Sequence, residues 1–210
     1  MMVAISKTPL AGALSAAARE LYIVGLHALG CAVARGRYVQ GQDFKLNLGC
    51  GRDYRVGWIN IDLRHRAYLR LDLRKPLPFL QSSAACVYAE HLLEQLPYPG
   101  SAFQLLQECG RVLVPGGQLR IDVPDTERVI HAYSAGERHA YFQLAKELWH
   151  PDWCRTMMEH VNYQFRDDGD HLFVYAFIAL KALLIHFSST SHPRWILARF
   201  VECVRCGDRF

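Results

Sequence analysis

The chain has 210 residues, of which 51% are hydrophobic and 21% are charged, a composition that excludes an intrinsically disordered protein. Its length suits one well-packed domain with attachments and leaves little room for a second full domain. The formal charge of +4 includes no run of Lys or Arg, so nucleic acid is not expected as a partner.

Residues 1–43 are predicted to form an N-terminal helical extension, because positions 10–34 are rich in Ala and Leu. The apolar run at 21–34 is shorter than the roughly 20 residues that cross a bilayer. The segment also lacks the early basic region and the cleavage site of a secretory signal. We expect a helix packed on the domain, and peripheral contact with a membrane surface is the alternative.

From Phe44 onward, short apolar stretches alternate with helical ones, which is the pattern of βαβ units. This pattern predicts an α/β fold with a doubly wound, mostly parallel sheet over residues 44–210. Ser101 is expected to cap a helix that ends at the breaker 115–117. The expected strands are 44–48, 58–62, 69–72, 85–88 and 118–123, with a short helical turn over 90–96.

The pattern after the fifth strand is mainly helical. Positions 127–149 predict a long helix, and positions 175–187 predict a second, buried one. One more strand is expected within 196–204. Residues 126–173 should therefore form a helical cover beside the sheet.

A glycine turn, Gly49–Gly51, follows directly on the first predicted strand. A glycine pair at this place lets a ligand approach the backbone closely, since no side chain occupies the space. Asp62 ends the next strand, where its carboxylate could accept both hydroxyls of a ribose. In an open α/β sheet, ligands bind at such strand ends, where the strand order reverses. The sequence therefore indicates a nucleoside-type ligand.

Two common nucleotide motifs do not fit this turn. The dinucleotide fingerprint needs a small residue where Tyr54 stands, and the Gly-Lys-Ser/Thr of a Walker loop is missing. A pyrophosphate ligand is therefore disfavoured, and a nicotinamide oxidoreductase remains a distant alternative. S-adenosylmethionine has no phosphate and does not require the third glycine.

The sequence resembles the class I S-adenosylmethionine-dependent methyltransferases, most closely the small single-domain group called type 11. The resemblance extends from about Lys45 to Asp125 and weakens toward Leu184. The stretches that carry it are Leu46–Gly51, Gly57–Asp62, Leu71–Leu73 with Pro76–Phe79, Tyr88–Glu94 and Leu105–Pro124.

The resemblance implies a Rossmann-like methyltransferase fold, with residues 126–173 as the cover on the acceptor side. It also implies the parts of S-adenosylmethionine that each motif would contact. The Gly49–Gly51 turn would pack against the methionine part, and Asp62 would hold the ribose. Asp72 and Leu73 would lie near the adenine, and Glu90 and His91 beside the sulfonium. The implied cofactor-binding residues are Asn47, Gly49, Cys50, Gly51, Asp62, Asp72, Leu73, Glu90 and His91.

Methyl transfer is a direct displacement at an activated carbon, so the protein mainly aligns the nucleophile and excludes water. A general base is needed only where the nucleophile carries a proton of high pKa. His91 and Asp125 are the catalytic candidates, because both follow the carboxyl ends of strands. A helix-capping or lining role is the alternative for each.

Two departures from the family pattern bear on activity. Asn47 stands where many relatives carry an acidic residue, although an amide can still orient the loop by hydrogen bonds. Relatives also close the sheet with an antiparallel strand pair, whereas only 196–204 offers a strand here. A cofactor-binding pseudoenzyme or regulatory subunit is therefore an alternative to an active enzyme.

The resemblance implies that the acceptor is a small molecule or a sugar or lipid-linked intermediate of a surface polysaccharide. A tRNA or protein methyltransferase is a further alternative, and it should show a basic surface around the mouth of the site. The oligomeric state is not predicted.

Seven cysteines in no repeating spacing argue against a disulfide scaffold and favour a reducing compartment, so we expect a cytoplasmic protein. The one Cys-x-x-Cys, at 203–206, lacks the second ligand pair of a structural zinc site. The histidines that follow Asp125 have no convincing ligand spacing, and no metal is predicted. These histidines are His131, His139, His150, His160 and His171.

Overall fold

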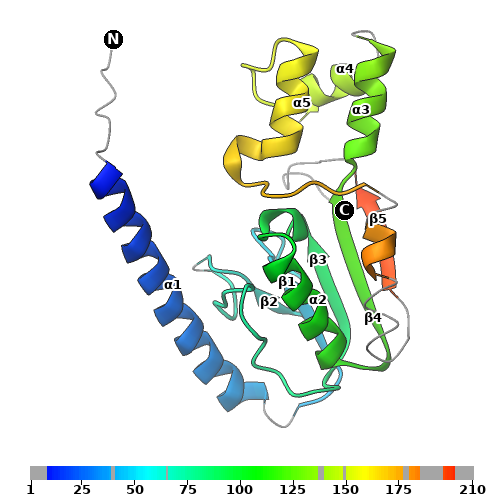
Figure 1. The fold of residues 1–210 in the computed structure, drawn as a ribbon. Helices are drawn as coiled ribbons and strands as arrows, with labels where there is room; N and C mark the ends of the chain where they lie inside the picture. Colours follow the sequence, from blue (N-terminus) through cyan, green and yellow to red (C-terminus); the bar gives the residue numbers. More distant parts are fainter. Residues whose placement is uncertain are drawn as a thin grey trace.

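The computed structural model describes residues 9–38, 41–64, 66–136, 140–148, 150–176, 180–184 and 196–201. Its centre is a five-stranded, all-parallel sheet of order β2-β1-β3-β4-β5 (Figure 1). The strands are β1 Phe44–Leu48, β2 Ile59–Ile61, β3 Ala84–Glu90, β4 Leu113–Pro124 and β5 Ile196–Val201. The predicted α/β class with a parallel sheet is confirmed.

The helices divide into three groups. α1 (Pro9–Tyr38) precedes the sheet, and α2 (Gly100–Val112) joins β3 to β4. A helical cover of α3 (Thr126–Ala135), α4 (Ala140–Leu148) and α5 (Met157–Arg166) follows β4, and 180–184 is a further helical stretch. Two 3-10 turns, η1 (Leu93–Gln95) and η2 (Asp167–Gly169), complete the described elements.

The winding of the sheet reverses between β1 and β3. The chain leaves β1 toward β2 on one side and then crosses to β3 on the other side, after which β4 and β5 continue outward. Such a reversal opens a crevice at the carboxyl ends of the two flanking strands. Most side chains of the central strands β1 and β3 are apolar and buried or half-buried, as expected for parallel strands covered on both faces.

The predicted strand at 69–72 is wrong. Only Leu69 forms a bridge, with Ile61, and the ladder stops there. The backbone N–H of Asp72 is instead donated to His27 Nδ1 of α1, at 3.2 Å, and its carbonyl closes a turn to Lys75. Leu69 and Leu71 are apolar because they enter the core from a loop.

Helix boundaries differ from several expectations. α2 begins one residue before Ser101, with Pro99 as its cap, and ends at Val112, so the glycines 116 and 117 lie within β4. The long helix expected at 127–149 is broken at Gly136, whose φ of 95° terminates α3. In the segment 175–187, only 180–184 is described as helical, and 177–179 and 185–187 lie outside the described residues.

The C-terminal strand pairs in a different sense from the family pattern. β5 runs parallel to β4, and no antiparallel pair occurs in the described part of the chain. Residues 202–204, the end of the predicted strand, lie outside the described residues.

α1 packs on the domain through its C-terminal half. Ala34 is fully buried in the main core, and Gly30 approaches the backbone of Arg70 so closely that a Cβ would clash. The other half leans away from the sheet (Figure 1). Large apolar side chains are exposed along both halves of the helix, and these are Leu10, Leu14, Leu21, Tyr22, Val24 and Leu29.

α1 is also longer than the apolar run suggested. By length and composition alone, its 30 residues could cross a membrane. Core helices of other proteins and N-terminal signal sequences also meet these two criteria. The apolar run at 21–34 is thus only part of a longer helix, which begins well before residue 21.

The cover α3–α5 lies beyond the carboxyl ends of the strands (Figure 1) and has a small core of its own. Val129 and Ala132 of α3 pack against Tyr141, Phe142 and Ala145 of α4, with α5 closing the group. The cover thus stands at the edge of the sheet where the crevice opens.

Candidate functional site

A cavity of about 570 Å³ lies at the reversal point between β1 and β3. This volume falls in the range of roughly 300–1,000 Å³ that is common for small-molecule sites. Residues that follow β1 and residues at the end of β3 form its walls. The lining residues are Asn47, Gly49, Cys50, Gly51, Arg52, Asp53, Arg64, Tyr88, Glu90, His91 and Gln95.

The glycine turn needs its glycines. Gly49 and Gly51 have φ angles of 65° and 52°, in the left-handed region that other residues seldom adopt. A Cβ at Gly49 would also come within 3.0 Å of the Leu92 side chain. Cys50 lies between the two glycines. Burial is the main cause that raises the pKa of its thiol to about 12, so this cysteine stays protonated and is not a nucleophile.

A buried amide pair fixes the loop that follows this turn. The side chain of Asn47 donates to the Asp53 carbonyl at 2.8 Å and to Asn60 Oδ1 at 2.9 Å. Asn60 in turn accepts from the Arg55 N–H and donates to the Arg55 carbonyl. An amide at position 47 therefore does orient the loop, through donors that a carboxylate would lack.

Asp62 follows β2 and stabilises the glycine turn through hydrogen bonds. Its Oδ2 accepts from the Gly51 N–H at 2.9 Å and its Oδ1 from the Arg64 N–H at 2.8 Å. The residue is not among those that line the cavity. The ribose assignment stays a prediction, and it would use the lone pairs that these two bonds leave.

Tyr88 lies between two carboxylates at the inner end of the cavity. Its hydroxyl is 2.7 Å from Glu90 Oε2 and 2.8 Å from Asp122 Oδ2. Burial and these two carboxylates raise the pKa of Tyr88 far above its ordinary value. Arg120 pairs with Asp122 at 2.7 Å, and the Arg55 guanidinium lies 3.7 Å from the Tyr88 ring centroid. Asp122 thus pairs with Arg120 and is not a lining residue, whereas the Glu90 carboxylate lines the cavity and has Arg55 Nη2 at 3.9 Å.

His91 lines the cavity and is held in one orientation. Its φ of 48° is left-handed, its N–H donates to the Asp122 carbonyl, and its Nδ1 is 3.2 Å from Glu94 Oε1. Its Nε2 is buried and has no hydrogen-bond partner among the described residues. Burial lowers the pKa of His91, but Glu94, with Glu90 and Asp167, outweighs it and raises the pKa above the ordinary value.

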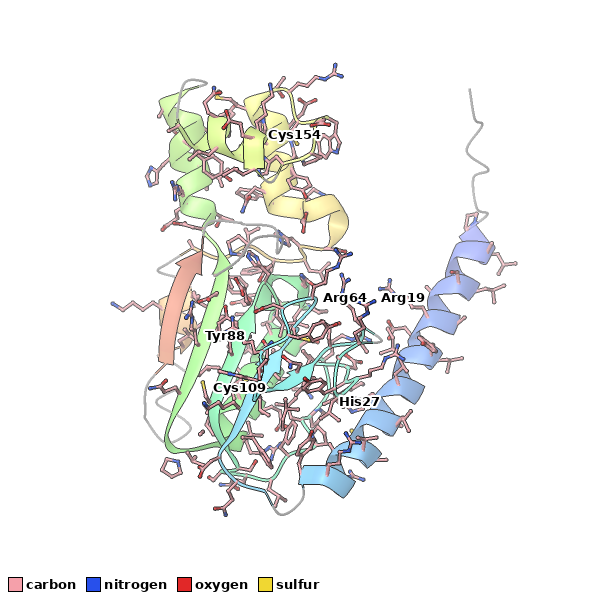
Figure 2. The ribbon with its side chains drawn as sticks, turned by 180° about the vertical axis from the view of Figure 1, so that it is seen from behind. Arg19, His27, Arg64, Tyr88, Cys109 and Cys154 are labelled. Atoms are coloured by element: carbon pink, nitrogen blue, oxygen red, sulfur yellow. The ribbon has the colours of Figure 1, made fainter. Side chains whose placement is uncertain are left out.

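Besides Asp62, the predicted cofactor residues Asp72 and Leu73 lie away from the cavity lining. Asp72 is buried against α1, where the Arg74 guanidinium donates to its carboxylate and also pairs with Glu20. Figure 2 shows His27 nearby, on the face of α1 that is turned toward the sheet. Although burial opposes it, the Arg74 guanidinium keeps the pKa of Asp72 below its usual value. Leu73 belongs to the main core. Their adenine assignment stays a prediction.

Asp125 caps α3, because its side chain accepts from the Arg128 N–H at 3.3 Å. It is not one of the cavity-lining residues, and its catalytic role stays a prediction. The capping alternative describes what this carboxylate does.

Sequence reasoning missed several lining residues, which are Arg52, Asp53, Arg64, Tyr88 and Gln95. Tyr88 was detectable, since it lies two residues before Glu90 and so faces the same side of a strand. Asp122 pairs in register with Glu90 on the neighbouring strand. Gln95 lies in the 3-10 turn η1, and Arg52, Asp53 and Arg64 lie on loops whose paths the sequence pattern does not determine.

No family model, curated protein or solved structure matches the chain. The likeness to a family therefore stays a resemblance of motifs, of which the glycine turn and Glu90–His91 line one cavity.

Proposed function

We propose that the protein is a methyltransferase with a Rossmann-like fold that uses S-adenosylmethionine, acting on a small molecule or on a sugar or lipid-linked intermediate. One observation carries this proposal. The glycine turn after β1 and the Glu90–His91 pair at the end of β3 line a single cavity at the reversal point of the sheet. These are two of the motifs that the family resemblance assigns to the cofactor.

The cavity residues fit this cofactor in polarity and charge. A Cβ at Gly49 would come within 3.0 Å of the Leu92 side chain, so this glycine lets the turn lie close to the core, and His91 Nε2 is an orphaned buried polar atom in the cavity wall. Arg52 and Arg64 are lining cations that could bind a carboxylate, and Glu90, which also has Arg55 Nη2 at 3.9 Å, is a lining anion that could face a positive sulfonium. The absence of phosphate from S-adenosylmethionine agrees with a turn that has only two glycines.

When bound, S-adenosylmethionine supplies a methyl group already activated by the sulfonium. The chain then has to position the nucleophile and keep water out. Of the lining residues, His91 is the one suited to hold or accept a proton, at Nε2, because Glu94 fixes Nδ1. Tyr88 and Cys50 are unsuited, since both stay protonated.

The distribution of the basic residues favours a small acceptor over a nucleic acid. Arg70 donates to the Tyr22 hydroxyl and to the Leu63 carbonyl, and Arg74 pairs with Glu20 and Asp72. These cations join α1 to the domain, so they do not form a basic surface around the cavity mouth.

Isothermal titration calorimetry with S-adenosylmethionine and S-adenosylhomocysteine tests the proposal. Micromolar binding of either ligand is expected, weakened at least tenfold in Glu90→Gln and unchanged in the control Glu147→Gln, which alters an exposed residue of α4. Absence of binding by both ligands would overturn the proposal, as would binding of NADH in their place. Release of S-adenosylhomocysteine in a screen of acceptors would then separate an enzyme from a pseudoenzyme.

A further inference from the structure

Two histidines and a cysteine meet inside the helical cover. His150 follows α4, Cys154 lies in the connection to α5, and His160 lies on α5 itself. All three are buried, with exposed fractions of 6%, 0% and 4%, and their ligand atoms lie within 4.8 Å of one another. Figure 2 shows Cys154 among α3–α5, whereas Tyr88 of the cavity lies in the sheet.

The backbone is arranged to bring these side chains together. The His150 N–H donates to the Ala145 carbonyl at 2.7 Å, which turns the chain back at the end of α4. The Cys154 N–H donates to the Pro151 carbonyl at 3.0 Å, so the connection is a tight turn. Thr156 and Glu159 then form a capping box that fixes the start of α5 at Met157, three residues before His160.

The donor set is the one that zinc prefers. Imidazole nitrogens and a thiolate sulfur are the usual ligands of Zn²⁺, and buried sites of this kind hold the ion through three or four of them. His150 Nε2 lies 3.4 Å from Gln164 Oε1, and Tyr141 also bonds that oxygen. A partner on Nε2 fixes the imidazole tautomer and leaves Nδ1 for the ion, as in most metal-bound histidines.

The distances require only a small adjustment. His150 Nδ1 and His160 Nδ1 are 2.6 Å apart, and the rings are stacked with centroids 4.9 Å apart. In a tetrahedral zinc site with Zn–N bonds of about 2.05 Å, two nitrogens stand roughly 3.3 Å apart. The rings therefore need to separate by less than about 1 Å, and the sulfur needs to approach by a similar amount.

We propose that His150, Cys154 and His160 form a binding site for a divalent cation of the zinc class. These described residues supply three ligands, and the fourth position of a tetrahedral ion is left for water. The ion would join the α4–α5 connection to α5 and stabilise the cover. This site is separate from the cavity and does not depend on the cofactor proposed for it, and it replaces the expectation that the protein has no metal site.

The cover contacts the cavity wall through the same helix. His171 Nδ1 is 3.0 Å from the Gln164 carbonyl, and its Nε2 is 4.0 Å from Glu94 Oε1, the partner of His91. Gln164 thus lies between the proposed metal site and the wall, so an ion at His150 would also steady the segment that meets Glu94.

Titration of the metal-stripped full-length protein with Co²⁺ and Zn²⁺ tests the site. We expect one equivalent of Co²⁺ to give tetrahedral absorption with a thiolate-to-cobalt charge-transfer band, which Zn²⁺ then displaces. Cys154→Ser should abolish the charge-transfer band. Zn²⁺ at about 100 times its Kd should raise the Tm of the wild type by about 5–10 °C.

The matched control is Cys203→Ser with Cys206→Ser, because that pair could bind metal by itself. The double variant should keep the band and the Tm shift. A band that persists in Cys154→Ser and disappears in the double variant would overturn the proposal, as would no band at all. His160→Gln, which should lower Co²⁺ affinity at least tenfold, provides a second test where Cys154→Ser does not fold.

Discussion

The carboxylate of Asp62 accepts a hydrogen bond from the backbone N–H of Gly51, with a distance of 2.9 Å between the two atoms. The other carboxylate oxygen accepts from the Arg64 N–H. The end of β2 thus holds both the glycine turn and the segment that carries Arg64 to the cavity. The shape of this turn thus depends on a residue that does not itself line the cavity.

Asp62→Ala removes both acceptors and should weaken S-adenosylmethionine binding at least tenfold. Hydrogen bonds to a charged acceptor contribute about 1.5–3 kcal/mol each, and the freed turn would lose its fixed shape. Calorimetry measures the effect. Binding by the variant that is as tight as by the wild type would remove both the supporting role and the ribose assignment.

Gly49→Ala should reduce both stability and affinity. The left-handed φ costs about 1–2 kcal/mol for a residue with a Cβ, and the new methyl group would press on Leu92. The matched control is Gly57→Ala, where φ is 79° and nothing lies within 4 Å. Urea unfolding should show a loss in both variants, whereas calorimetry should show weaker binding only for Gly49→Ala. Equal affinities of the two would argue against a ligand at the turn.

Asp125→Ala should lower the free energy of unfolding by about 1 kcal/mol, because α3 loses its N-cap. Asp125→Ser keeps an oxygen at the cap and should recover most of this loss. Neither substitution should change the rate of methyl transfer by the folded protein more than about twofold, because the capping residue lies outside the cavity lining. A large loss of rate in both, at normal stability, would restore Asp125 as a catalytic residue.

The pKa of His91 should be above its ordinary value of 6.5, and Glu94→Gln should lower it. The protonated ring and Glu94 stabilise the fold fully below that ordinary value, and this contribution is lost as the pH rises through the folded-state pKa. NMR titration of the ring measures the pKa directly. A pKa that is unchanged in Glu94→Gln would show that this carboxylate does not control His91.

If His91 accepts a proton during methyl transfer, the rate should rise with pH through the same pKa, since only the neutral ring has a free lone pair. The titration of wild-type His91 thus sets where the rate should change.

The sheet was predictable because its strands are short, apolar and bounded by turns. β1 was placed to the residue at Phe44–Leu48. The failure at 69–72 has a physical cause, since apolar side chains from a loop can fill a core as strand residues do. The sequence pattern does not show that the Asp72 N–H donates its hydrogen bond to His27 instead of to a neighbouring strand.

The candidate site was predictable where one motif follows one strand, as with Gly49–Gly51 and Glu90–His91. It was not predictable where tertiary packing decides. His150, Cys154 and His160 follow no zinc-finger spacing, because a turn and the start of a helix bring them together. Arg64 reaches the cavity from a loop whose path depends on Asp62.

The crystal structure of the protein with S-adenosylhomocysteine would show directly whether the cavity between β1 and β3 binds the cofactor. We expect the ligand in the cavity between the carboxyl ends of β1 and β3, with its amino-acid part beside Gly49–Gly51 and its ribose within hydrogen-bond reach of Asp62. Density for the ligand in another part of the molecule, or an empty cavity in crystals of a protein that binds the ligand in solution, would contradict this expectation.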